Sequence, residues 1–202
     1  MIKLDKNRFH KYIQFSKNIE DRMIYNHVRD ASRFDFMPKV PAELYNDIKA
    51  FSEKIVKTWD FKTSFTTGQE TSLDDYIWKA LADNSDSRPP SDDWQKLEIS
   101  EAFTDFIEPY LVMSFYGRFL LWHGNNVTQF GLRSPFEDSS NAVSPQDRSQ
   151  LIADTKRKAG VYWADFIKWM KEKNYTLDGG KYDFEKCDKS QNNKSTVKMF
   201  RI

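Results

Sequence analysis

Apolar residues recur at intervals of three or four positions through most of the chain, which is the spacing of helices that bury one face. One such stripe covers residues 23–34 and should end before Pro38. A second stripe follows Pro41, a residue suited to a first helical position, and covers residues 44–56. We therefore predict two packed helices that are joined across residues 37–40.

Two further helices are indicated in the second half of the chain. Residues 110–122 are almost all apolar or aromatic, so we expect a helix that begins at Pro109 and is buried on most sides. Ser144 and Pro145 then form a good helix start and open an apolar stripe of about 28 residues. Between these helices, the β-branched and alternating character of residues 125–134 predicts a short hairpin or strand arm.

Residues 59–107 separate the two helical parts. The first residues of this segment are rich in Thr, and their apolar positions show no regular spacing. Ser72 is then placed to cap a helical segment over residues 73–81. Residues 83–108 hold eight acids against two bases, which predicts a strongly acidic face. We interpret residues 59–107 as an acidic insertion in a helical domain that spans residues 1–174.

Residues 175–202 are polar and Lys-rich, and an Asp-Gly-Gly run near their start ends any helix. Their few apolar side chains cannot offset the roughly 1 to 2 kcal/mol of backbone entropy that each ordered residue costs. We expect an extended C-terminal arm that has no core of its own and becomes ordered only on a partner. Removal of residues 181–202 should then leave the stability of the isolated subunit nearly unchanged.

The composition favours a mainly α-helical fold. A chain of 202 residues can bury one substantial core, and only 7 glycines are available for the turns of a β-rich protein. The single cysteine, Cys187, excludes a disulfide within the chain. No stretch approaches the roughly 20 apolar residues of a membrane span, so we expect no membrane association. We predict a helical bundle with a short protruding β-hairpin or strand arm and an extended C-terminal arm.

A search for reactive groups finds no motif with a known chemistry. The sequence has no Gly-rich phosphate loop, no zinc-type spacing of His or Cys and no nucleophile elbow. The three histidines fall on separate segments, and His27 lies on an apolar stripe, where a structural role is expected. The acid pair Asp74 and Asp75 is expected to be solvated or part of an interface. We predict no catalytic, cofactor-binding or metal-binding residue and no enzymatic activity.

Apolar residues in turn-flanked or polar segments are the candidates for contacts between subunits. The hairpin and the C-terminal arm supply them: Val127, Thr128, Gln129, Phe130, Gly131, Leu132, Tyr182, Phe184, Val197, Met199, Phe200 and Ile202. The acidic insertion supplies a further set that is expected to line a channel or to face a basic partner: Asp92, Asp93, Glu98, Glu101 and Asp105.

Several runs occur in a fixed order: EPYL at 108–111, FYGRFLL at 115–121, GNNVTQFGL at 124–132 and KAGVY at 158–162. Together with the opening helices, this order resembles the neck (head-tail connector) proteins of tailed phages and prophages of Bacteroides-type hosts. The resemblance covers residues 2–174 and consists of aromatic, small and turn residues. Residues 59–107 are longer and more acidic than the family pattern, and the part after Gly180 is additional to it.

The resemblance implies a structural virion protein. Such proteins form a ring, usually twelvefold, between the portal and the tail, and the genome passes through the centre without sequence-specific binding. The implied partners are further copies of the chain, the portal protein and other neck or tail proteins, in a particle assembled in the bacterial cytoplasm. No cofactor is implied. The alternative is a helical DNA-binding or packaging accessory protein, motivated by the basic residues 156–158 and the basic C-terminal region, although near-zero net charge weighs against it.

Overall fold

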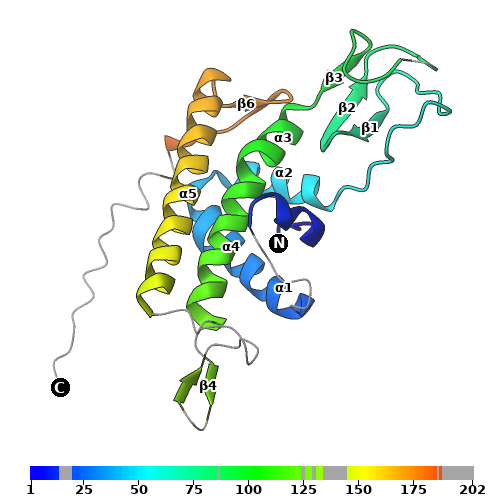
Figure 1. The fold of residues 1–202 in the computed structure, drawn as a ribbon. Coiled ribbons are helices and arrows are strands. Elements are labelled where there is room, and N and C mark those ends of the chain that lie inside the picture. Colours follow the sequence, from blue (N-terminus) through cyan, green and yellow to red (C-terminus); the bar gives the residue numbers. More distant parts are fainter. Residues whose placement is uncertain are drawn as a thin grey trace.

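The computed structural model describes residues 1–13, 20–85, 87–123, 126–128, 131–133, 145–185 and 187. Figure 1 shows a helical body, a small β-lobe that projects from one end of it, and a hairpin at the other end. The elements, in chain order, are η1 (Lys6–Lys11), α1 (Asp21–Asp30), η2 (Ala31–Phe36), η3 (Met37–Lys39), α2 (Ala42–Glu53), β1 (Glu70–Leu73), β2 (Tyr76–Ala80), β3 (Trp94–Lys96), α3 (Glu98–Glu101), η4 (Ala102–Ile107), α4 (Glu108–His123), β4 (Asn126–Thr128), β5 (Gly131–Arg133), α5 (Pro145–Glu172), β6 (Thr176–Leu177) and β7 (Gly180–Lys181).

Helices α4 and α5 lie side by side and form the centre of the body (Figure 1). Consecutive residues 110–113 of α4 are all buried, which means that this helix is covered on several sides, as predicted. Helix α5 covers one side with Phe166 and Met170, and the N-terminal elements cover another, with Phe9 of η1 packing against Phe115 at 5.2 Å between ring centroids. The fold is mainly α, as the sequence predicted.

Pro109 does not begin the central helix. The helical backbone starts at Glu98 and passes through the π-helical turn η4 into α4, so Pro109 lies inside a continuous helical segment. Proline has no N–H to donate to the preceding turn. The carbonyl of Thr104, five residues earlier, lies instead 3.5 Å from the hydroxyl of Tyr12. The wider π turn, together with this side chain from η1, accommodates a proline that would otherwise end the helix.

The segment 73–81, predicted to be a helix, is a β-hairpin. Strands β1 and β2 pair antiparallel with Leu73 opposite Tyr76, and β3 adds to the other edge of β2. The two turn residues Asp74 and Asp75 have φ values of 50° and 71°, as a tight turn that matches strand twist requires. Apolar residues at positions 73, 76, 77 and 80 have the spacing of a helix face, and the tight turn together with the strand pairing overrides that local pattern.

Residues 57–97, which we call the β-lobe, have a small core of their own. Phe65 and Trp94 pack edge to face with ring centroids 5.0 Å apart, and Ala80 is buried beside them. The helix that leads into the lobe, predicted to reach residue 56, ends at Glu53 and leaves Ile55 98% exposed. The reason is that residues 57–59 leave the helical path to exchange backbone hydrogen bonds with Ser72.

Helix α5 has the predicted length of 28 residues. The extended arm that was predicted to begin at residue 175 does not begin there. Strands β6 and β7 form a tight turn, Leu177 is buried, and the Tyr182 side chain lies in the main core at 6% exposure. The predicted boundary was wrong because these side chains find burial against α2 and α5 of their own chain. A deletion from residue 181 would therefore remove core residues.

Two glycines give a matched test of the α4–α5 packing. A Cβ on Gly117 would lie 3.0 Å from the Thr155 hydroxyl oxygen, whereas a Cβ on Gly160 would meet nothing within 4 Å. We expect Gly160→Ala to raise the free energy of unfolding by up to about 1 kcal/mol, because alanine is the better helix former. Gly117→Ala should raise the free energy of unfolding by less than this, or lower it, because the Thr155 side chain must shift to make room for the new Cβ. Chemical denaturation measures both, and equal gains would contradict the close approach.

Candidate functional site

A groove runs between the turn η2–η3, helix α4 and helix α5. It encloses about 530 Å³, and its apolar lining includes Met113, Gly117, Ile152 and Ala159. The small side chains of Gly117 and Ala159 leave the space that a larger residue would fill. We call this feature the α4–α5 groove.

Cations gather in the α4–α5 groove. Arg118 makes a two-pronged contact with Asp35, with its Nε and Nη2 atoms 2.7 and 2.6 Å from the two carboxylate oxygens. The Lys39 ammonium lies over the rings of Tyr110 and Trp163, at 5.1 and 5.2 Å. Burial lowers the pKa of Lys39, and the nearby Asp35 charge partly opposes this. The groove has one carboxylate but more than one cation, so it favours an acidic occupant.

Exposed apolar side chains are present in the lining of the α4–α5 groove. Phe34 and Leu121 line it and are 58% and 56% exposed. Met37, Trp122 and Val161 are also exposed and adjoin lining residues in the sequence. Surface apolar groups that cluster around a concave site usually mark a contact with another macromolecule.

The predicted hairpin is present as strands β4 and β5, at the end of α4 (Figure 1). Val127 pairs with Leu132 and Thr128 with Gly131. Four of the predicted interface residues therefore lie on these two strands. The other two of that set, Gln129 and Phe130, lie outside the described residues.

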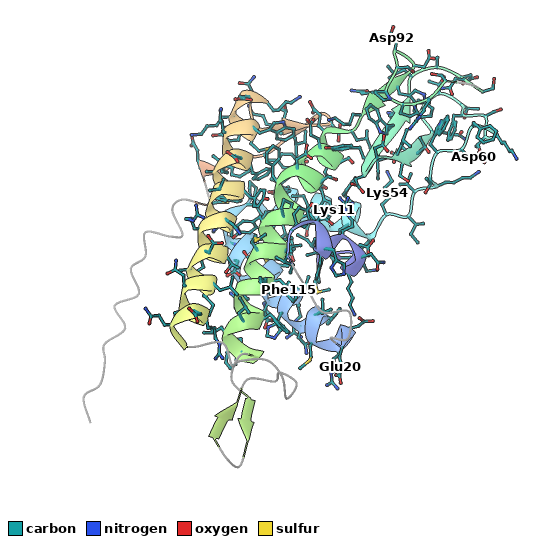
Figure 2. All side chains as sticks on the ribbon, viewed as in Figure 1. Lys11, Glu20, Lys54, Asp60, Asp92 and Phe115 are labelled. Carbon is teal, nitrogen blue, oxygen red and sulfur yellow. The ribbon has the colours of Figure 1, made fainter. Side chains whose placement is uncertain are left out.

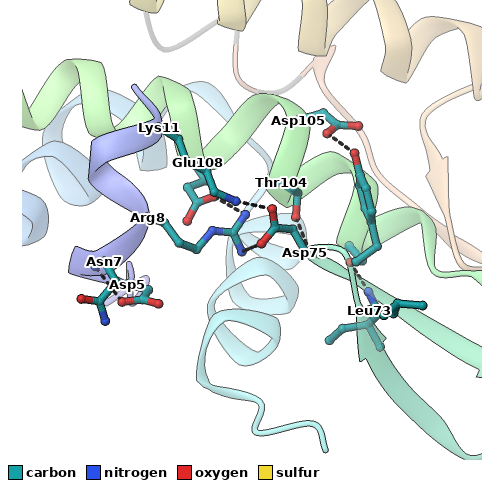
Figure 3. A network of polar contacts seen from close by, with 12 residues as sticks. Asp5, Asn7, Arg8, Lys11, Leu73, Asp75, Thr104, Asp105 and Glu108 are labelled. Atoms are coloured by element: carbon teal, nitrogen blue, oxygen red, sulfur yellow. Dashed lines mark hydrogen bonds and ion pairs between the residues drawn. The ribbon is translucent and has the colours of Figure 1, made fainter. Parts of the chain in front are cut away.

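A polar network holds the β-lobe on the body, as Figure 3 shows. The Glu108 side chain is only 1% exposed, and its carboxylate lies 2.6 Å from Nη2 of Arg8 and accepts a hydrogen bond of 3.1 Å from the Tyr12 hydroxyl. Arg8 also faces Asp75 of the β1–β2 turn, and Lys11 forms an ion pair with the same carboxylate. The network thus joins η1, α4 and the lobe at one point.

The electrostatics of this network follow from burial. Burial raises the pKa of Glu108, and the positive charge of Arg8 opposes the rise. The hydrogen bond from Lys11 lowers the pKa of Asp75. Further along the lobe junction, the Tyr76 hydroxyl donates to Asp105 at 2.7 Å, which with burial raises the pKa of Tyr76 to about 12. The Nε and Nη2 atoms of Arg8 are buried without a hydrogen-bond partner among the described residues, so Arg8 acts here through its charge. The contacts join η1, α4 and the lobe, and the arrangement serves to fix the lobe.

Three of the acids predicted to line a channel or to face a partner make contacts within their own chain. Asp105 accepts from Tyr76, and Glu101 pairs with Lys96 at 3.2 Å. Glu98 binds Lys173 at 2.8 Å, while the Asp178 carboxylate accepts from the backbone N–H groups of residues 98 and 99. Asp92 is exposed at the outer end of the lobe, and Asp93 is half-buried.

Two predicted arm contacts belong to the core instead. The Tyr182 hydroxyl donates to Asp47 at 2.9 Å, and Phe184 packs against Tyr175 with ring centroids 5.2 Å apart. Tyr182 is therefore buried in its own chain, and Phe184 is partly buried against the same core. The remaining predicted contacts lie outside the described residues: Val197, Met199, Phe200 and Ile202.

Other candidate chemistry is modest in the described part of the chain. Within it, no group of three or more His, Cys, Asp or Glu side chains is placed to hold a metal ion. Nor does any helix there combine the length and apolar character needed to cross a membrane. In the basic run 156–158, Arg157 and Lys158 both pair with Asp154. His27 stacks edge to face on Phe119, as expected for a structural histidine.

Residues 74–196 match the model of a family described as "Family of unknown function (DUF6712)". The chain belongs to this family. No curated protein and no solved structure matched the chain. The region shared with DUF6712 begins at the β1–β2 turn and includes α4, the hairpin and α5, whereas Arg8, Phe34 and Lys39 lie before it. The DUF6712 match thus covers one side of the groove and one side of the polar network.

Sequence reasoning missed Glu108, Arg8 and Lys39. One signal was available, because Glu108 is a lone acid between apolar residues at the start of an almost wholly apolar helix. A carboxylate in that position needs a cation from elsewhere in the chain. No pattern in the sequence indicates that Arg8 supplies it.

The network makes a pH-dependent prediction. Arg8→Met should lower the free energy of unfolding by about 2 to 3 kcal/mol near neutral pH, because it leaves a buried carboxylate without its cation. The raised pKa of Glu108 means that the folded protein binds this proton more tightly than the unfolded chain. The loss should therefore shrink as the pH falls toward about 5, which denaturation at a series of pH values measures.

The matched control is the double variant Arg8→Met, Glu108→Leu, which removes both charges and should recover most of the stability at every pH. Asp75 and Glu98 have lowered pKa values, so each carboxylate stabilises the fold at pH values above its ordinary pKa, which is 3.8 for Asp75 and 4.5 for Glu98. Their contributions to the free energy of unfolding therefore do not offset the effect of Glu108 at about pH 5. A loss in Arg8→Met that does not depend on pH would contradict the assignment.

Proposed function

We propose that this protein is a structural subunit of the neck of a tailed phage, where copies form a ring that joins the portal to the tail and leaves a channel for DNA. The observation that carries the proposal is the exposed apolar surface around the α4–α5 groove, beside the end of α4 from which the hairpin continues. A surface of this kind is suited to burial between subunits. The order of sequence runs that resembles neck proteins supports the same conclusion.

The alternative, a DNA-binding accessory protein, has less support from the described residues. The formal net charge is +1, and Asp154 pairs with two of the three basic residues at 156–158. Affinity for DNA depends on concentrated positive charge and falls steeply with salt. Size-exclusion chromatography with light scattering, electron microscopy of the oligomer and a salt-dependent DNA shift assay separate the two functions. Monomers at all concentrations with tight, salt-sensitive DNA binding would favour the alternative.

We expect Phe34→Glu and Leu121→Glu, made separately, to weaken self-association by about tenfold or more, because each places a charge in an apolar contact. Ile55→Glu is the control, since Ile55 is almost fully exposed and lies away from the groove. Light scattering across a concentration series gives the association constants, and circular dichroism checks the fold. Equal behaviour of all three variants would contradict a role for the groove surface.

The C-terminal segment can be tested once its boundary is corrected. Truncation after Cys187 keeps Leu177, Tyr182 and Phe184, so the melting temperature of the subunit should change by no more than about 2 °C. The same truncation should lower attachment to the portal or the next ring, since Val197, Met199 and Phe200 are the expected contacts. Reconstitution with purified portal measures this. Unchanged attachment would remove the segment from the interface.

A further inference from the structure

The outer end of the β-lobe, which we call the lobe tip, consists of the loops 60–68 and 81–93. Acids outnumber bases among its described residues: Asp60, Asp83, Asp92 and Asp93 against Lys62 and Arg88. Figure 2 shows Asp60 and Asp92 at this outer end, away from the helical body. Phe61 and Leu81 in the same loops are 66% and 50% exposed. The lobe tip is therefore an acidic surface with exposed apolar side chains.

The α4–α5 groove has the complementary character. Among the described residues, neither Lys39 nor Lys156 forms an ion pair, although both line the groove. Phe34 and Leu121 supply exposed apolar area beside these two cations. Charge complementarity of this kind selects a partner and sets the register of a contact.

The lobe tip cannot reach the groove of its own chain. The lobe joins the long helix at Glu98, and the groove is lined by Gly117 and Arg118 near the other end of that helix. At 1.5 Å per residue, these positions are about 30 Å apart along the axis. The polar network around Glu108 also holds the lobe at its own end of the helix. A contact between the two surfaces must join separate copies.

We propose that the lobe tip of one subunit docks in the α4–α5 groove of the next. In this contact the lobe carboxylates meet Lys39 and Lys156, and Phe61 and Leu81 cover the exposed apolar side chains at the groove rim. The proposal rests on the ring function proposed above, because a contact between two different surfaces repeats head to tail and closes into a ring when the rotation permits.

Cross-linking tests the contact directly. In a Cys187→Ser background, the pair Asp92→Cys and Lys156→Cys, carried on one chain, should give a ladder of covalent dimers, trimers and larger species with a short bismaleimide. Each single-cysteine variant should give no ladder, because it lacks one half of the contact. Asp92→Cys with Lys168→Cys is the control, since Lys168 is exposed on α5 outside the groove.

Charge reversal tests the electrostatics without a cross-linker. We expect Lys156→Glu and Asp92→Lys each to weaken self-association several-fold, and the double variant to recover most of the loss, since the reversed charges again face each other. Asp165→Lys on the exposed face of α5 is the control and should have no effect. Circular dichroism and melting of every variant confirm that the fold is retained.

The outcomes separate this contact from the ring function. Rings that form but give no ladder, with additive charge-reversal defects, would overturn the docking contact and leave the ring function standing. Cross-linking that stops at a dimer would show a symmetric contact and also overturn it. A chain that stays monomeric at every concentration would contradict both proposals.

Discussion

Burial of the Glu108 carboxylate is the constraint on which the arrangement of the molecule depends. A carboxylate removed from water costs several kcal/mol unless a cation and a hydrogen-bond donor accompany it. Arg8 and Tyr12 supply them, so η1 must lie against α4. Because Arg8 also faces Asp75, the turn of the β-lobe closes on the same point. The buried charge therefore brings the N-terminal segment and the turn of the lobe to one point on α4, and the hydrogen bond from Tyr76 to Asp105 adds a second contact between lobe and helix.

The long helix 98–123 connects the β-lobe to the α4–α5 groove, the two surfaces that we propose meet in an assembly. Its first turn receives a cap from Asp178, eighty residues further along the chain, and its π turn allows Pro109 to remain inside the helix. The lobe is thereby held at one end of a stiff element and the α4–α5 groove near the other. A rigid separation of two complementary surfaces is what a repeating assembly requires, since flexible spacing would not close a ring reproducibly.

The α4–α5 groove combines a paired cation with a cation that forms no ion pair among the described residues. Arg118 and Asp35 satisfy each other, but Lys39 is held over two aromatic rings beside exposed apolar groups. The DUF6712 match begins at residue 74, so the helices α4 and α5 on one side of the groove belong to it, whereas the η2–η3 turn on the other side does not. The partner specificity of this chain can thus depend on residues outside the region it shares with its family.

The sequence by itself determined the mainly α fold, the burial of the first turns of α4, the bounds of α5 and the hairpin β4–β5, because periodicity and helix-start residues act locally. Only the tertiary structure decided that residues 73–80 belong to a β-hairpin, that Pro109 lies within a helix and that Tyr182 is buried. The tertiary structure alone also places Arg8 beside Glu108 and Asp178 beside Glu98. These outcomes depend on pairings between residues far apart in the chain, whose free energy outweighs local propensity and leaves no periodic signal.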